Sequence, residues 1–289
     1  MGAIVAHLGP KGTNAEAAAL AYAKWLQQKT GEQSCLRPYP SIAQSIRAAA
    51  EGQAHLAVVP VENSLEGSVT MTLDTLWQLD ALQIRHALVL PIVHALLSWA
   101  ENLTDIRTVY SHPQALAQCQ GWLDRFLPWV QVVPTNSTTD AIENLEQEKT
   151  AAAISSQRAA QIYNVPILAC PINDNPDNCT RFWVLSLKSG SEALNFGENE
   201  GSRSHTSLAF SVPANMPGAL AKPLLVIANR NINLSRIESR PTKRSLGEYL
   251  FFIDIEADAN EPFIQAAIAQ LAAYTETLKI FGSYSILPI

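Results

Sequence analysis

The sequence predicts an α/β protein with a larger N-terminal part and a smaller βαββαβ unit at the C-terminal end. Apolar strand-like runs alternate with helical stretches from residue 4 to residue 188. This alternation is typical of a mostly parallel sheet covered by helices, with room for two lobes. Residues 189–203 are rich in Gly, Ser, Glu and Asn and predict a linker. Residues 204–289 then follow the order of a ferredoxin-like sandwich.

The composition is that of an ordinary globular protein and argues against several function classes. Of the 289 residues 47% are hydrophobic and 16% charged, and the net charge of -6 makes a general nucleic-acid surface unexpected. The longest apolar stretch, residues 87–99, is interrupted by Pro91 and is too short to span a bilayer. The four cysteines form no CxxC pair, and the N-terminus has no signal-peptide features. We therefore expect a reduced cytoplasmic protein without a metal site.

The first unit combines an apolar strand at residues 4–8, a glycine turn at 9–13 and an Ala-rich helix at 15–28. The turn places backbone N–H groups at a helix N-terminus, which favours an anion. Its spacing differs from that of a Walker loop. Taken alone, it is better explained as an ordinary tight turn.

A second polar segment follows the next buried strand. Ser41 is expected to cap a helix that runs to about Glu51, and the strand at 55–60 is followed by Glu62-Asn63-Ser64. Open α/β sheets bind ligands at such strand ends. A helix N-cap with solvated glutamates explains these residues equally well.

A third polar segment, Ser111-His112-Pro113-Gln114, follows a strand at 108–110. Ser111 and His112 are not a nucleophile–base pair, because adjacent side chains diverge and no orienting acid is evident. Helix capping is the preferred interpretation of the segment in isolation. The other predicted elements here are helices at 70–78, 114–126, 136–148 and 155–163, and strands at 84–99, 130–133, 151–154 and 167–172.

The segment 178–182, Asn-Cys-Thr-Arg-Phe, leads from a turn-rich stretch into a buried strand predicted at 182–187. A strand mouth can present the Thr180 hydroxyl and the Arg181 cation to a ligand. From these residues alone, a loop that hydrogen-bonds its own backbone is the better interpretation. Thr180 also precedes its strand, so we expect it to approach the shared cleft from a crossing segment.

The C-terminal unit is predicted as a binding or assembly module and not as a second enzyme. Pro217, preceded by Asn215, is expected at the start of its first helix. Its predicted strands span 205–212, 233–240, 247–257 and 280–287, and its predicted helices span 217–228 and 262–271.

These segments, in this order, resemble the motifs of the prephenate dehydratase family in its monofunctional form. The similar segments are residues 9–13, 59–67, 111–119 and 178–182, the last resembling the Thr-Arg-Phe motif, and residues 232–241 resemble the phenylalanine-binding signature of an ACT domain. The resemblance covers essentially the whole chain. It implies a two-lobed periplasmic-binding-protein-like catalytic domain at 1–188 and an ACT regulatory domain at 204–289. The lobes would comprise 1–76 plus 168–188, and 77–167.

The activity implied by this resemblance is the decarboxylative dehydration of prephenate to phenylpyruvate, water and carbon dioxide in L-phenylalanine biosynthesis. Aromatisation drives that reaction, so no cofactor or metal is expected. The resemblance also implies feedback regulation by L-phenylalanine and a homodimer or homotetramer. Its catalytic residues would be Thr180, Arg181, Asn63 and Ser64. Substrate would contact Lys11, Gly12, Thr13, Glu62, Ser111, His112, Gln114, Asn178 and Phe182. The effector would contact Gly218, Ala219, Leu220, Asn233, Leu234, Glu238, Ser239, Arg240 and Pro241.

Two residues of the Thr-Arg-Phe motif have separable roles. Thr180 can hydrogen-bond the departing hydroxyl but is a poor general acid, because the pKa of an alcohol is far above operating pH. Arg181 can clamp a carboxylate. If the strand already includes residue 180, the two side chains point to opposite faces and Arg181 is structural instead.

Two departures from the family pattern and two rival functions remain. Asn14-Ala15 stand where the family usually has Phe-Ser, and Gly218-Ala219-Leu220-Ala221 replaces Gly-Ala-Leu-Val, which predicts weaker feedback inhibition. Arogenate dehydratase is the first rival, because Glu62 would favour an aminated substrate. A two-lobed solute-binding protein without catalysis is the second.

Overall fold

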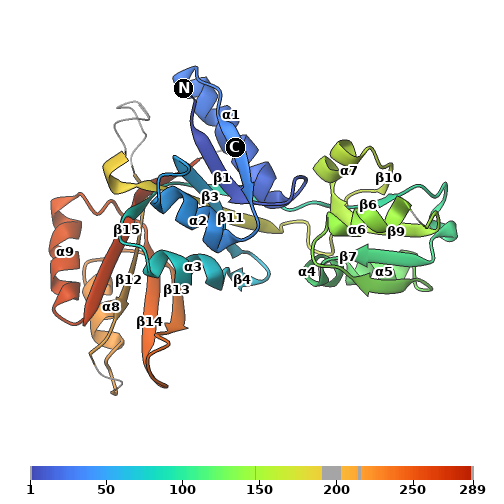
Figure 1. Ribbon diagram of the computed structural model, residues 1–289. Coiled ribbons are helices and arrows are strands. Elements are labelled where there is room, and N and C mark those ends of the chain that lie inside the picture. The colour runs from blue at the N-terminus through green and yellow to red at the C-terminus, as the bar shows by residue number, and fades with distance from the viewer. Residues whose placement is uncertain (1, 147, 191–202, 214–215, 288–289) are drawn as a thin grey trace.

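The computed structural model describes residues 2–146, 148–190, 203–213 and 216–287. These residues form two lobes and a C-terminal unit, with the second lobe set apart from the other two parts (Figure 1). Most of the predicted linker, residues 191–202, lies outside the described residues. Among the described helices, none has the length and apolar character needed to cross a membrane.

The first lobe is built on five long strands in the order β2-β1-β3-β11-β5. These strands are β1 (Ile4–Leu8), β2 (Cys35–Tyr39), β3 (Leu56–Asn63), β5 (Leu82–Pro91) and β11 (Cys179–Leu187). Helix α1 (Asn14–Thr30) packs on one face, and α2 (Ile42–Ala50) and α3 (Thr70–Trp77) pack on the other. The Ser41 side chain caps α2 as predicted, accepting from the backbone N–H of Gln44.

The prediction of a mostly parallel sheet is wrong for this lobe, because β11 runs antiparallel to both of its neighbours, β3 and β5. The reversal brings the first residues of β11 to the end of β3 where the chain leaves that strand. β11 also begins at Cys179, three residues earlier than predicted. Thr180 therefore reaches the strand ends from within the sheet, and no separate crossing segment is needed.

The second lobe contains a five-stranded sheet in the order β10-β6-β9-β7-β8. Its strands are β6 (His94–Ser98), β7 (Thr108–Ser111), β8 (Gln131–Pro134), β9 (Ala151–Ser156) and β10 (Ile167–Ala169). Its helices are α4 (Pro113–Ala117), α5 (Gln120–Phe126), α6 (Asp140–Glu143) and α7 (Gln157–Tyr163). The helix predicted at 136–148 is therefore much shorter, with one 3₁₀ turn, Asn144–Glu146, after it.

The division between the lobes also differs from the expected one. The stretch predicted as one strand at 84–99 is two strands, β5 and β6, and these belong to different sheets. Because β5 pairs with β11 along most of its length, residues 82–91 lie in the first lobe and not with 77–167. The chain thus crosses between lobes near Ile92 and returns before Asn178.

The C-terminal unit has the predicted βαββαβ order, with its strands arranged β13-β14-β12-β15. Its elements are β12 (His205–Ser211), α8 (Ala221–Ala228), β13 (Leu234–Pro241), β14 (Tyr249–Ile255), α9 (Pro262–Ala272) and β15 (Thr277–Leu287). Helices α8 and α9 share one core with the sheet. α8 begins at Ala221 and not at Pro217, because Gly218 has a φ of 81° and residues 217–220 form a turn. The predicted boundary residue Asn215 lies outside the described residues.

The last strand joins the C-terminal unit to the first lobe. Ser285 to Leu287 of β15 pair in parallel with His86 to Leu88 of β5, which merges two sheets into one of ten strands, β4 (Gly67–Ser68) included. At Gly282 the φ is 131°, and the backbone passes so close to β5 that an added Cβ would lie 2.8 Å from the Ile84 carbonyl oxygen. Glycine is needed at this crossing for both its conformation and its lack of a side chain.

Candidate active site

A cleft of about 730 Å³ lies where the two lobes meet. Its walls come from the glycine turn before α1, the end of β3, the first turn of α3, the start of α4, the segment before α6, and β11. Of the residues singled out in the sequence, the cleft is lined by Thr13, Asn63, His112, Gln114, Thr180 and Phe182. The three polar segments that follow strands, together with β11, thus meet at one site.

The amide of Asn63 holds the hydroxyl of Thr180. Asn63 Nδ2 lies 2.9 Å from Thr180 Oγ1 and 2.9 Å from Asn178 Oδ1. The amide orientation is fixed, because Asn63 Oδ1 accepts hydrogen bonds from the backbone N–H groups of Leu65 and Glu66. Thr180 Oγ1 is therefore an acceptor for Asn63, and its own hydrogen can point into the cleft.

Behind this pair, a polar chain continues through Gln118, which sequence analysis missed. Gln118 Oε1 accepts from Asn178 Nδ2 at 2.9 Å and lies 2.9 Å from His94 Nε2. Burial lowers the pKa of His94, so the ring is neutral at pH 7 and carries its hydrogen on the nitrogen that faces Gln118. Gln118 lies one helical turn after Gln114, and this i, i+4 spacing is the signal that could have identified it. His94 had no comparable signal, because it lies inside an apolar run.

Among the described residues that line the cleft, none is Lys or Arg, whereas Glu66 and Asp140 are acidic. An anion would instead meet neutral donors and the beginnings of helices α1 and α3, where the helix dipole is positive. His112 adds one donor: its Nδ1 accepts from the Gln114 N–H at 3.3 Å, so the ring can donate from Nε2.

Seven predicted site residues do not line the cleft: Asn178, Arg181 and Glu62, and four others, Lys11, Gly12, Ser64 and Ser111. Lys11 is exposed, and the Gly12 N–H donates to Glu16 Oε2 at 2.7 Å. Ser64 is exposed and accepts from the Cys179 N–H. Ser111 is buried and donates to the Ile154 carbonyl at 2.6 Å. Of these last four, all but Lys11 hold the backbone around the cleft by hydrogen bonds.

Arg181 and Glu62 point away from the cleft. Thr180 and Arg181 are consecutive residues of β11, so their side chains lie on opposite faces of the sheet. Arg181 Nη1 lies 3.3 Å from Asp254 of the C-terminal unit, and Nη2 lies 3.6 Å from Glu62. The prediction that Arg181 clamps a ligand carboxylate is therefore wrong, and its structural alternative holds. Glu62, paired with Arg181, likewise does not line the cleft.

The two lobes are held together beside the cleft by an ion pair. Arg158 of α7 donates to Glu16 of α1 at 3.0 Å, and Ser156 donates to the Gly12 carbonyl at 2.8 Å. Burial acts to raise the pKa of Glu16, but the hydrogen bonds from Arg158 and from the Gly12 N–H outweigh it and lower that pKa. The glycine turn thus serves as one contact between the lobes.

The predicted effector residues lie on two neighbouring parts of the C-terminal unit. Gly218 and Ala219 lie in the turn before α8, and Leu220 packs against the same core as Leu234 at the start of β13. Asn233, Glu238, Ser239 and Pro241 lie on or beside β13. The exception is Arg240, whose guanidinium makes two 3.1 Å hydrogen bonds to Asp74 of α3. Arg240 is therefore engaged with the first lobe.

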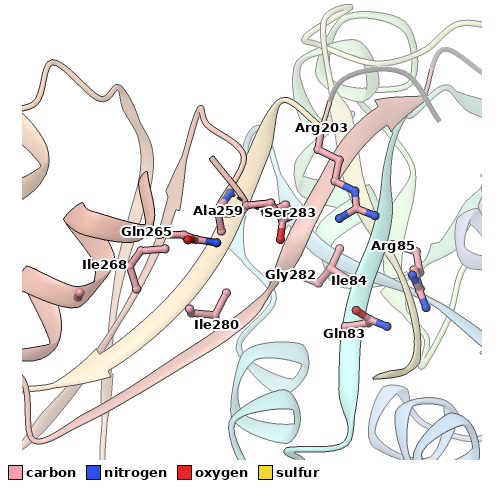
Figure 2. Close-up of a pocket in the computed structure, with 12 residues that line it drawn as sticks. Gln83, Ile84, Arg85, Arg203, Ala259, Gln265, Ile268, Ile280, Gly282 and Ser283 are labelled. Atoms are coloured by element: carbon pink, nitrogen blue, oxygen red, sulfur yellow. Dashed lines mark hydrogen bonds between the residues drawn. The ribbon is translucent and has the colours of Figure 1, made fainter. Parts of the chain in front are cut away.

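A second, smaller cavity of about 420 Å³ lies between β5, β15 and α9 (Figure 2). Gln83 and Ile84 border it from β5, and Gly282 and Ser283 from β15. It contains none of the residues that the motifs singled out, so the cleft between the lobes is the candidate active site. No group of three or more His, Cys, Asp or Glu among the described residues is placed to hold a metal ion.

Comparison with known proteins identifies relatives of both parts of the chain. The prephenate dehydratase family model matches residues 5–190, and the ACT domain model matches residues 206–273. A prephenate dehydratase from Lactococcus lactis subsp. cremoris (strain MG1363) is 37% identical over 285 residues, which cover 98% of this chain and 97% of the relative.

Solved structures agree over the whole length. The structure of a prephenate dehydratase in complex with L-Phe from Arthrobacter aurescens superposes with a TM-score of 0.84 at 34% identity, covering 98% of this chain and 90% of that one. A structure described as GqqA, a novel type of quorum quenching acylase, superposes with a TM-score of 0.77 at 27% identity, covering 99% and 98%. One fold therefore carries two reported activities.

Proposed function

The chain belongs to the prephenate dehydratase family and ends in an ACT domain, and we propose on this premise that its cleft converts prephenate to phenylpyruvate, water and carbon dioxide. The observation that carries the proposal is the pairing of Asn63 with Thr180 at the cleft wall. This pair presents an oriented hydroxyl hydrogen, which the departing hydroxyl group requires.

The chemistry follows from charge movement in the substrate. As the ring carboxylate leaves as carbon dioxide, electrons move toward the ring carbon that bears the hydroxyl, and hydroxide leaves. Thr180 stabilises the negative charge that develops on that oxygen, and Asn63 holds Thr180 in place. An alcohol is too weak an acid to supply the whole proton, so Thr180 orients and stabilises the leaving group.

The lack of Lys and Arg among the described residues that line the cleft suits this reaction. An arginine paired with the departing carboxylate would stabilise the substrate more than the transition state, in which that charge disperses. Hydrogen-bond donors such as Gln114 and His112, together with the start of α1, bind the carboxylates and stabilise the ground state less than an arginine would. We therefore assign Thr13, His112, Gln114 and Phe182 to substrate binding, with Asn178 supporting Asn63.

Arogenate, which carries an ammonium group, is the second candidate substrate. Glu66 favours it, because this carboxylate lines the cleft 3.4 Å from Gln118 Nε2. Purified protein should form phenylpyruvate from prephenate faster than phenylalanine from arogenate, measured side by side. A reversed preference would transfer the assignment to arogenate. Binding without turnover of either compound, or acylase activity alone, would overturn the dehydratase proposal.

L-phenylalanine is the proposed feedback inhibitor. The ACT domain, the matching turn at 218–221 and strand β13 support this assignment, and Ala221 in place of the usual Val predicts weak inhibition. Millimolar L-phenylalanine should raise the melting temperature and lower turnover, whereas an unchanged melting temperature would remove the effector assignment.

We further propose a cytoplasmic homodimer or homotetramer with domains at 1–188 and 204–289. Four free cysteines are compatible with a reducing compartment. Light scattering at assay concentrations would measure the assembly state.

A further inference from the structure

A buried cluster of charges joins the C-terminal unit to the strand that carries Thr180. Asp254 of β14 is fully buried, and its carboxylate accepts from Arg236 Nε at 2.8 Å and from Ser207 Oγ at 2.6 Å. Arg181 of β11 is the third donor, at 3.3 Å. The carboxylate thus gathers donors from β11, β12 and β13, one of them in the first lobe.

Strand β11 is irregular next to Arg181. Thr180 pairs with Asn63 and Arg181 with Glu62, but the register with β3 shifts between Arg181 and Phe182. Such a bulge changes the direction in which nearby side chains point. The backbone hydrogen bonds between β11 and β3 therefore do not determine that direction by themselves. The hydrogen bond from Arg181 to Asp254 therefore helps to set where the neighbouring Thr180 lies.

Arg236 reaches a second wall of the cleft. Its Nη1 donates at 3.3 Å to Ser68 Oγ, and Ser68 lines the cleft. Its guanidinium lies 5.4 Å from the ring centroid of Trp183, which lies two residues after Arg181 on β11. Asp254 fixes Arg236 and so acts on β4 and β11 together.

The charges in the cluster balance. Two guanidinium groups, of Arg181 and Arg236, face the carboxylates of Asp254 and Glu62. Removing the charge of Asp254 would leave two cations in one largely buried site, where their repulsion is weakly screened. Arg181 would then shift toward Glu62, which lies at the partly exposed end of the cluster.

We propose that Asp254, a residue of the ACT domain, is a positioning residue for catalysis, acting through Arg181 and Arg236 on Thr180 and Ser68. This inference rests on the proposed function, since it assigns Thr180 to the leaving group. It also gives the ACT domain a part in turnover when no effector is bound: the active site is complete only with the C-terminal unit docked.

The kinetic test compares Asp254→Asn, Arg181→Gln and Arg181→Lys with a matched control, Asp258→Asn, in the loop after β14. Asp254→Asn and Arg181→Gln should each lower kcat about tenfold or more with KM within about twofold, the signature of a lost transition-state interaction. Arg181→Lys retains the cation and should recover most of kcat. The double variant Arg181→Gln/Asp254→Asn should be no worse than Asp254→Asn alone, because that change already breaks the contact with Arg181.

Folded Asp254→Asn with wild-type kcat, or additive losses in the double variant, would overturn the proposal. If Asp254→Asn does not fold, the contrast between Arg181→Lys and Arg181→Gln decides it. Hydrogen exchange of residues 179–187 separates this inference from the proposed function. Weakened protection there in Asp254→Asn, and not in Asp258→Asn, supports the coupling even if wild-type protein fails to turn over prephenate, and unchanged protection contradicts it.

Discussion

Asn63 and Thr180 face each other across the antiparallel pair of β3 and β11, with Asn63 Nδ2 2.9 Å from Thr180 Oγ1. The direction of this hydrogen bond matters more than its length. Because the amide nitrogen can only donate, Thr180 accepts from Asn63 and retains its own hydrogen for a ligand.

Replacing Thr180 by valine removes the hydroxyl and keeps the shape. We expect kcat to fall by more than about 100-fold with KM nearly unchanged, because the lost hydrogen bond forms mainly in the transition state. Steady-state kinetics with prephenate measure both values. Thr180→Ser, which keeps the hydroxyl, should recover part of the activity, and near-normal turnover by Thr180→Val would contradict the assignment.

Asn63→Asp tests the direction of the hydrogen bond. The retained oxygen still accepts from the N–H groups of Leu65 and Glu66, so the turn should survive. The new oxygen faces Thr180 as an acceptor and draws the hydroxyl hydrogen away from the cleft. We expect kcat to fall about 10²–10³-fold, with circular dichroism unchanged. Unaltered kcat would show that Thr180 does not need its hydrogen.

The ion pair between Glu16 and Arg158 predicts a pH dependence of stability. The folded pKa of Glu16 is lowered below its ordinary 4.5, so ionised Glu16 stabilises the fold above that value. The stabilisation disappears as the pH falls through the lowered pKa. At neutral pH the melting temperature of the wild-type protein should exceed that of Glu16→Gln. This difference in melting temperature should disappear in acid. A gap that stays constant down to the acid range would rule this linkage out.

Gly282→Ala should loosen the joint between β15 and β5. The added Cβ would lie 2.8 Å from the Ile84 carbonyl oxygen, at a φ of 131°. We expect a loss of about 1–3 kcal/mol in the free energy of unfolding, measured with urea. Gly52→Ala is the control, because Gly52 also has a positive φ but no neighbour within 4 Å. Equal losses in both variants would mean that the close approach costs nothing.

The cysteines should differ widely in reactivity. Burial raises the pKa of Cys119 to about 12, so almost no thiolate forms at pH 8. Cys35 is exposed. Iodoacetamide at pH 8 followed by peptide mass spectrometry should modify Cys35 and leave Cys119 intact, and labelling of Cys119 in folded protein would contradict its burial.

The sequence was sufficient to predict the structural elements that depend on local sequence patterns. The βαββαβ order and the cap at Ser41 were confirmed. The antiparallel direction of β11 was not predictable from local pattern, since it depends on where the chain returns from the second lobe. The helix at 136–148 was overpredicted because Ser137 and Thr135 bond nearby backbone groups, which competes with helix formation.

Part of the candidate site was also predictable from the motifs, and the rest depended on packing. Sequence order was enough to place Asn63, His112, Gln114 and Thr180 near one another. It could not tell which face of β11 meets the cleft, and so assigned Arg181 to substrate. That choice depends on the pleat of the strand within the sheet, which a single sequence does not specify.

The shared ten-stranded sheet has a consequence for a protein that contains only the two N-terminal lobes. A chain cut after residue 190 would lose β15 and leave His86 to Leu88 of β5 without the neighbour that now covers them. Ala87 and Leu88 are fully buried in the intact chain. An open, apolar strand edge of this kind is a template for pairing with other chains. The truncated protein should therefore self-associate and aggregate. Loss of the three-residue pairing between β15 and β5 would be enough to cause this.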